Sequence, residues 1–214
     1  MANKRIDVMG KHKQSVDTQV LSRIEKHDAG WVFTPTDFVD LGSRTAVATA
    51  LKRHKACGTI RQLGRGIYDI PRHHAKLGVL WPSPDAIVAA VKNRDSVRVQ
   101  PTGAYAANLL GLSDQVPSKI FYLTDGPART VKMGNMTISF KRTTPRNMAT
   151  SDRVSGLVIQ ALRWLGPKNV NNRMVNILRK RFDQSAKKQL LDDIRYSPVW
   201  IADIMRQIAQ KPGV

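Results

Sequence analysis

The sequence has a single cysteine and no long apolar run, and each of these absences excludes certain classes of protein. Cys57 is the only cysteine among the 214 residues, which excludes an internal disulfide and fits a reducing compartment. No apolar run approaches the roughly 18 residues that a membrane-spanning helix needs, and no apolar stretch follows the charged N-terminus. We therefore expect a cytoplasmic protein that is neither secreted nor inserted in a membrane.

Acidic residues are also scarce, because 16 Asp and Glu face 35 Lys and Arg, which gives a net charge of +19. The excess is spread over the chain, with 14 basic against 7 acidic groups in residues 1–80, 9 against 4 in 81–150 and 12 against 5 in 151–214. Such a surplus favours a polyanionic partner, since phosphate contacts dominate nucleic-acid affinity. The charge alone does not distinguish DNA from RNA.

What the sequence does contain is an ordinary share of apolar residues, 42%, and enough length for one or two domains. Residues 1–15 are polar and basic and predict a flexible arm. After this arm, apolar residues at helical spacing predict a helix over residues 16–27, and residues 31–33 suit a short strand.

Two further helices and a hairpin are predicted next. Thr34, Pro35 and Asp37 carry the cap and first-turn signals of a short second helix that ends at Gly42. Ser43 can cap a third helix that runs to about residue 55. Two β-rich runs joined by Gly64-Arg65-Gly66 predict a hairpin. The order helix, strand, helix, helix, hairpin over residues 16–72 is that of a winged helix-turn-helix.

The predicted third helix has two different sides. One side is apolar and is expected in the core, with Val47, Ala50, Leu51 and His54. The other is small and cationic, a shape that can approach base edges in a major groove. The predicted DNA-binding residues of this domain are Ser43, Arg44, Thr45, Thr49, Lys52, Arg53, Arg61 and Arg65.

These residues have different expected roles. Thr45, Thr49 and Lys52 are candidates for base contacts, while Ser43 and Arg44 would meet phosphate at the helix start. Arg53 flanks the exposed side of the helix. In the hairpin, Arg61 and Arg65 are the candidate wing contacts. The alternative is that the charged side is an ordinary solvated helix surface.

The remainder of the chain predicts a mixed α/β domain over residues 73–150 and a helical region over 151–214, so the fold class is α+β. A helix opens at Pro82 or Pro84 and is followed by a strand over residues 97–101. Residues 103–112 form a helix of small side chains, which indicates close helix packing, with a partner surface as the alternative. Three strands and four C-terminal helices complete the prediction. The strands are IFYLT, RTVKM and MTISFK, and the helices lie near 152–165, 170–180, 185–195 and 198–210.

No enzyme signature is found, and we expect no catalytic residue, cofactor or metal. Gly42-Ser43 suggests the start of a nucleotidyltransferase motif, but no metal-binding acid occurs between Asp40 and Asp69. His54 and Cys57 have a spacing that zinc ligands use, yet a core histidine and a buried small cysteine explain them more simply. Three further acids are expected on polar helix faces, namely Asp192, Asp193 and Asp203.

Two stretches resemble the AbiEi-type antitoxins, in the branch where a domain of unknown function follows the winged helix. They are WVFTPTDFVDLGSRTAVATALKRHKACGTIRQLGRGIYDIP and QPTGAYAANLLGLSDQVPSKIFYLTDGPARTVKMGNMTISFKRT, and the resemblance covers residues 20–150. It implies a recognition helix at residues 44–55 and a wing at 61–68. It also implies a bacterial antitoxin of a type IV toxin–antitoxin or abortive-infection system. Such proteins repress their own operon and counteract a nucleotidyltransferase-like toxin without forming a stable complex with it.

The expected function is therefore a DNA-binding autorepressor and antitoxin whose partners are operator DNA and, functionally, that toxin. The oligomeric state stays open, with two molecules on an inverted repeat as one arrangement. The alternative is an RNA-binding module that engages structured RNA through its basic C-terminal region. An enzyme with an unrecognised site is the third and weakest hypothesis.

Overall fold

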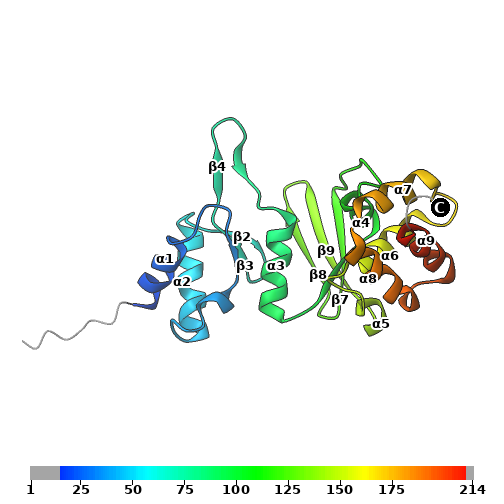
Figure 1. Cartoon of the computed structure of the whole chain (residues 1–214). Coiled ribbons are helices and arrows are strands. Elements are labelled where there is room, and N and C mark those ends of the chain that lie inside the picture. Colours follow the sequence, from blue (N-terminus) through cyan, green and yellow to red (C-terminus); the bar gives the residue numbers. More distant parts are fainter. Residues whose placement is uncertain (1–14, 211–214) are drawn as a thin grey trace, which may run out of the picture. The chain divides into compact units, whose positions relative to one another are not determined.

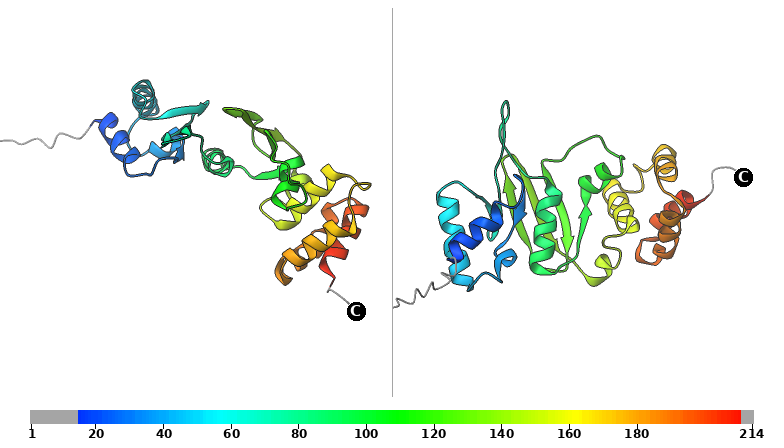
Figure 2. Two further views of the ribbon diagram at one scale, coloured as in Figure 1. Left: turned by 90° about the horizontal axis from the view of Figure 1, so that it is seen from above. Right: turned by 60° about the vertical axis from the view of Figure 1, so that its left-hand side comes forward.

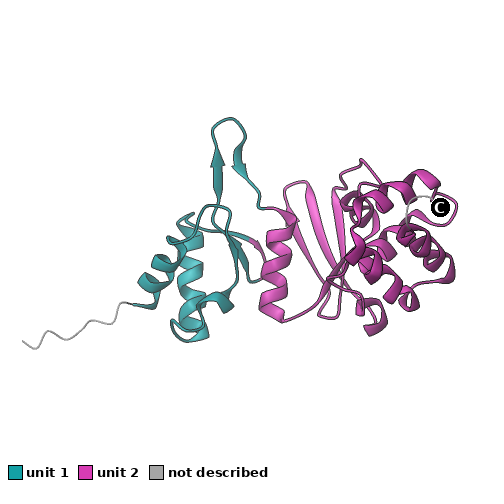
Figure 3. Cartoon of the chain, in the orientation of Figure 1, with its two compact units in different colours: residues 1–62, 66–82 teal, residues 63–65, 83–214 magenta. Residues whose placement is uncertain are grey.

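Residues 15–210 are described by a computed structural model of the chain, and they divide into two units (Figures 1 and 3). Unit 1 holds the described residues up to Gln62 together with residues 66–82, and unit 2 holds Leu63–Arg65 and residues 83–210. The basic arm expected over residues 1–15 lies outside the described residues, apart from Ser15. The chain is an α+β protein, as the sequence predicts.

Unit 1 has the element order that the sequence predicts, with one additional hairpin. Its elements are α1 (Val16–Ile24), β1 (Val32–Phe33), the 3₁₀ helix η1 (Pro35–Phe38), α2 (Arg44–Ala56), β2 (Arg61–Gly64), β3 (Ile67–Asp69), β4 (Arg72–His74) and β5 (Gly78–Leu80). The first three strands form a sheet in the order β1-β3-β2, and β4 and β5 form a separate two-stranded sheet. The end of β2 belongs to unit 2.

The core of unit 1 lies between α1, α2 and the three-stranded sheet. Val20 and Ile24 of α1 pack with Val47 and Leu51 of α2, and all four side chains are at most 2% exposed. A stack of aromatic rings continues this core, since the Phe33 ring lies 4.6 Å from Trp31 and 5.5 Å from Phe38 between centroids. These contacts bury the apolar side of each short helix and so stabilise both.

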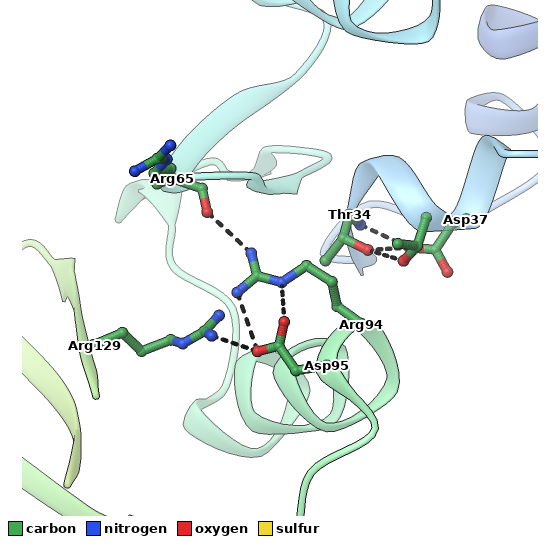
Figure 4. A network of polar contacts seen from close by, with 7 residues as sticks. Thr34, Asp37, Arg65, Arg94, Asp95 and Arg129 are labelled. Carbon is green, nitrogen blue, oxygen red and sulfur yellow. Dashed lines mark hydrogen bonds and ion pairs between the residues drawn. The ribbon is translucent and has the colours of Figure 1, made fainter. Parts of the chain in front are cut away.

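The second helix is shorter than predicted. It is one turn of 3₁₀ helix, η1, and does not continue to Gly42. Its predicted start is correct, because the Asp37 carboxylate accepts a hydrogen bond from the Thr34 backbone N–H at 2.7 Å (Figure 4). Phe38 is fully buried, and the chain then turns through residues 39–42 toward α2.

Unit 2 combines a mixed sheet with a group of C-terminal helices. Its elements are α3 (Pro84–Asp95), β6 (Val99–Thr102), α4 (Gly103–Leu109), β7 (Lys119–Thr124), β8 (Arg129–Met133), β9 (Met136–Arg142), α5 (Pro145–Met148), α6 (Val154–Leu165), α7 (Asn172–Arg181), α8 (Gln184–Asp192), η2 (Ile194–Tyr196) and α9 (Val199–Ala209). The strands lie in the order β6-β7-β9-β8, and only β7 and β9 run parallel. In Figure 2, α3 lies along one face of this sheet.

The helical core of unit 2 forms where α4 packs on α6 and where α7, α8 and α9 join them. Ala106 and Ala107 of α4 are fully buried, which confirms that the small residues of this helix serve close packing. Leu162 of α6 and Ile208 of α9 belong to the same apolar cluster. The segment over 83–150 and the C-terminal helices thus lie in one unit.

Most predicted elements of this part are confirmed within one to four residues, including all three strands after residue 118. No helix within residues 15–210 is both long enough and apolar enough to cross a membrane.

Candidate nucleic-acid interface

Helix α2 begins and ends where the sequence predicts. The Ser43 hydroxyl caps its N-terminus by accepting a hydrogen bond from the Ala46 backbone N–H at 3.2 Å. At the other end, Cys57 donates its backbone N–H to the Arg53 carbonyl, and Gly58 adopts a φ of +77°. Glycine accepts this left-handed conformation without a steric penalty, so the helix stops there.

The two sides of α2 differ as expected. Val47, Ala50, Leu51 and His54 are buried, and His54 is 7% exposed. The opposite side is exposed to solvent and carries Arg44, Thr45, Ala48, Thr49, Lys52 and Arg53, which together we call the α2 face. The 3.6-residue period of the helix therefore separates the packing residues from the candidate DNA contacts.

Few acidic groups lie near the α2 face. Arg53 is 3.8 Å from the Asp17 carboxylate, and its side chain is 67% exposed. Arg44 and Lys52 have no ion pair or side-chain hydrogen bond within residues 15–210. Two of the three cations on this face are thus available to phosphate or base edges, and small Thr and Ala side chains separate them.

Three other residues around α2 have internal partners. Ser43 Oγ caps the helix and lies 3.1 Å from Thr45 Oγ1, which ties both hydroxyls into the helix start. Lys55 donates a hydrogen bond to the Gln62 side chain at 2.7 Å. His54 Nε2 lies 3.7 Å from Asp17 Oδ1, so its ring faces α1.

Arg61 occupies a different place from the one that a wing contact would need. Its guanidinium pairs with the Asp69 carboxylate through two hydrogen bonds of 3.0 and 2.6 Å, and it donates a third, of 3.0 Å, to the Leu80 carbonyl. The guanidinium carbon also lies 4.1 Å from the centre of the Trp81 ring. Arg61 therefore holds β2, β3 and the end of β5 together, and this geometry favours a structural role over a phosphate contact.

Arg65 lies in the exposed turn between β2 and β3, as predicted. Its backbone carbonyl accepts a hydrogen bond from Arg94 at 3.0 Å, and its side chain points away from that contact (Figure 4). Arg94 and Arg129 both pair with Asp95, at 3.0 and 2.5 Å. Within the described part of the chain the Arg65 guanidinium makes no ion pair or hydrogen bond, so its charge remains available.

Sequence reasoning missed the Arg94–Asp95–Arg129 group, because its members lie on α3 and β8, more than 30 residues apart. It also missed the β4–β5 hairpin. The only signals for that hairpin are Gly78 and the absence of acidic residues between Asp69 and Asp85.

Two expectations about reactive residues are wrong. Cys57 is exposed and not buried, because it follows the last turn of α2 and lies beyond the side that packs on the core. Asp193 is not on a polar face, since its side chain is 2% exposed, pairs with Arg153 at 2.9 Å and accepts a hydrogen bond from Ser155. Within residues 15–210, no three His, Cys, Asp or Glu side chains gather as metal ligands would.

The fold and the α2 face define the chain as an α+β protein with a cationic, solvent-exposed helix surface. The chain belongs to DUF6088, a family of unknown function whose model matches residues 19–190. The match begins in α1 and ends in α8. No curated protein matches the sequence.

Proposed function

We propose that the chain binds duplex DNA through the α2 face and represses transcription of its own operon. The observation that carries this proposal is the α2 face itself. Among the residues that the structure describes, Arg44 and Lys52 have no partner, and Thr45 and Thr49 leave room for close approach to base edges. The order of elements in unit 1 and its β1-β3-β2 sheet support the interpretation of residues 16–72 as a winged helix-turn-helix.

The biological role is proposed from the resemblance to AbiEi-type antitoxins. On this proposal the protein is cytoplasmic, is not an enzyme, and counteracts a nucleotidyltransferase-like toxin without forming a stable complex with it. The proposed partner in transcription control is the operator of the operon that encodes both proteins.

Binding to the promoter of this operon tests the proposal. In a gel shift at about 150 mM salt, the full chain should prefer the promoter duplex over a scrambled duplex of the same composition by at least roughly tenfold. Equal affinity for both duplexes would contradict operator recognition.

A second candidate function is binding of structured RNA, which the excess of 12 basic over 5 acidic groups in residues 151–214 favours. Competition between the promoter duplex and a hairpin RNA of equal length separates the two functions. If the protein recognises an operator, promoter DNA should displace the RNA, and the RNA should displace promoter DNA poorly.

A further inference from the structure

The β4–β5 hairpin projects from the body of unit 1 (Figures 1 and 2). Arg72 pairs with Leu80, His73 with Val79 and His74 with Gly78 across its two strands. The turn is closed by His74, whose Nδ1 accepts hydrogen bonds from the backbone N–H groups of Lys76 and Leu77 at 3.2 and 3.3 Å. The hairpin therefore has a defined register and a defined tip.

Arg61 fixes the base of this hairpin. The guanidinium holds the Leu80 carbonyl on one side and the Asp69 carboxylate, which is 1% exposed, on the other. Trp81, the next residue after β5, stacks on the same guanidinium. Because its base is anchored in this way, the hairpin keeps a fixed direction relative to the rest of unit 1. A mobile loop would not have a fixed direction.

The surface of the hairpin is cationic and apolar at once. Every residue from Arg72 to Val79 is exposed, with Leu77 at the tip 70% and Val79 45% exposed. Arg72 and Lys76 have no ion pair within residues 15–210, and no carboxylate occurs in the sequence between Asp69 and Asp85. The hairpin thus presents two cations without an ion pair in the described residues and an exposed leucine. This combination suits a nucleic-acid duplex, whose phosphates attract cations and whose grooves can accept an apolar side chain.

We propose that the β4–β5 hairpin is a DNA-binding arm that contacts the duplex beside the segment bound by the α2 face. Arg72 and Lys76 bind phosphates, and Leu77 enters the minor groove, which at about 6 Å wide admits a turn but not a helix. This inference rests on the proposed DNA-binding function, and it assigns the arm to affinity and site length, not to base preference.

Charge removal on the arm provides the first test. In the full-length protein, Arg72→Ala/Lys76→Ala should weaken promoter binding roughly three- to tenfold at 150 mM salt and lower the slope of log affinity against log salt by about 1.8. The control Lys168→Ala/Lys188→Ala removes the same charge from exposed sites of unit 2 and should lower the slope by clearly less than the arm variant does. Equal slopes in the arm variant and the control would overturn the proposal.

Leu77→Ala tests the apolar contact separately from charge. It should weaken promoter binding by roughly tenfold with an unchanged salt slope, because it removes apolar surface that the complex buries. The control is Val116→Ala, which shortens a side chain that is 76% exposed in unit 2. Circular dichroism spectra that match the wild type verify that the variants fold.

Hydroxyl-radical footprinting locates the arm on the DNA. The wild-type footprint should extend further on one side of each site than that of Leu77→Ala or of the double variant, while all of these proteins keep their preference for promoter over scrambled duplex. If wild-type protein prefers the promoter but the footprints are identical, only the arm is excluded. If it binds no duplex, the proposed function and the arm fail together. A change in sedimentation mass on altering the arm would instead show an interface between protein molecules and would contradict the proposal.

Discussion

Arg61 and Arg65 carry the same charge and lie four residues apart, yet their surroundings favour different roles, structural for Arg61 and phosphate binding for Arg65. Arg61 is paired with a buried carboxylate, and its side chain is 21% exposed. Arg65 extends from a turn, and within residues 15–210 its backbone carbonyl has a hydrogen-bond partner whereas its guanidinium has none. From the sequence, both arginines are candidate phosphate ligands. The pairing of Arg61 with Asp69 could not be predicted, because it depends on the register of the β2–β3 hairpin.

Arg61→Ala should therefore reduce stability. It leaves the Asp69 carboxylate buried without its cation, which typically costs about 3 kcal/mol of the free energy of unfolding. Urea unfolding followed by circular dichroism measures this loss. Arg65→Ala is the matched control and should stay within about 0.5 kcal/mol of the wild type. Equal stability of the two variants would mean that the Arg61–Asp69 pair contributes little.

Arg65→Ala should instead change binding. Because phosphate contacts carry no sequence information, the variant should lose affinity for promoter and scrambled duplex alike, and the salt slope should fall by about 1. Fluorescence anisotropy at several salt concentrations gives both quantities. A loss restricted to the promoter would show that Arg65 reads bases.

At the scale of elements, one ion pair links α1 to the segment after η1. Arg23 donates hydrogen bonds to both Asp40 carboxylate oxygens at 2.7 and 2.6 Å, and a third to the Asp37 carbonyl. The hydrogen bond from Arg23 is the largest influence on the Asp40 carboxyl and lowers its pKa below the ordinary value of 3.8.

The lowered pKa of Asp40 predicts how stability depends on pH. A carboxyl with a lower pKa in the folded state stabilises the fold at pH values above 3.8, and this contribution disappears as the pH falls through the folded-state pKa. Asp40→Asn should therefore lower the melting temperature at pH 7, and the difference from wild type should shrink below about pH 4. Asp192→Asn removes an exposed carboxylate as a control. A difference that is constant from pH 7 to pH 3 would contradict the assignment.

In unit 2, α6 lies close to its neighbours at Gly156. A Cβ atom there would clash with the Thr150 backbone carbonyl and the Gln100 side chain. Gly156→Ala should therefore destabilise the protein by about 1–3 kcal/mol, although alanine usually favours a helix. Thermal unfolding measures the effect, with Ser185→Ala at an exposed position of α8 as control. A variant as stable as the wild type would show that α6 can shift without cost.

The elements that the sequence predicts well are those whose signals are local. The capping of α2 by Ser43 and the burial of Val47, Ala50, Leu51 and His54 depend on neighbours within four residues, and both are confirmed. The strand positions in unit 2 follow from β-rich runs and the turns between them. Local signals therefore sufficed for the α2 face.

Features that depend on tertiary contacts could not be predicted. The β4–β5 hairpin lacks alternating apolar and polar residues, and its base is fixed by Arg61, eleven residues before β4 begins. Asp193 is buried because Arg153 and Ser155, about 40 residues earlier, supply its partners. The second helix is short because Phe38 already reaches the core within one turn.

At the scale of the whole molecule, positive charge occurs in every third of the sequence, including the 12 basic against 5 acidic groups of residues 151–214. Charge of this distribution supports non-specific affinity for any nucleic acid. Operator recognition requires more, because only side chains on the α2 face are proposed to distinguish base pairs. Affinity and preference are therefore expected to respond to different variants.

The ratio of affinities for promoter and scrambled duplex at about 150 mM salt tests this central claim most directly. The wild type should show a ratio of at least roughly tenfold. Thr49→Ala and Lys52→Ala should each lose about 1–3 kcal/mol of this preference, up to its full extent, whereas Lys168→Ala in unit 2 should retain it. Equal binding of the two duplexes by the wild type, or an unchanged ratio in both α2 variants, would contradict the account.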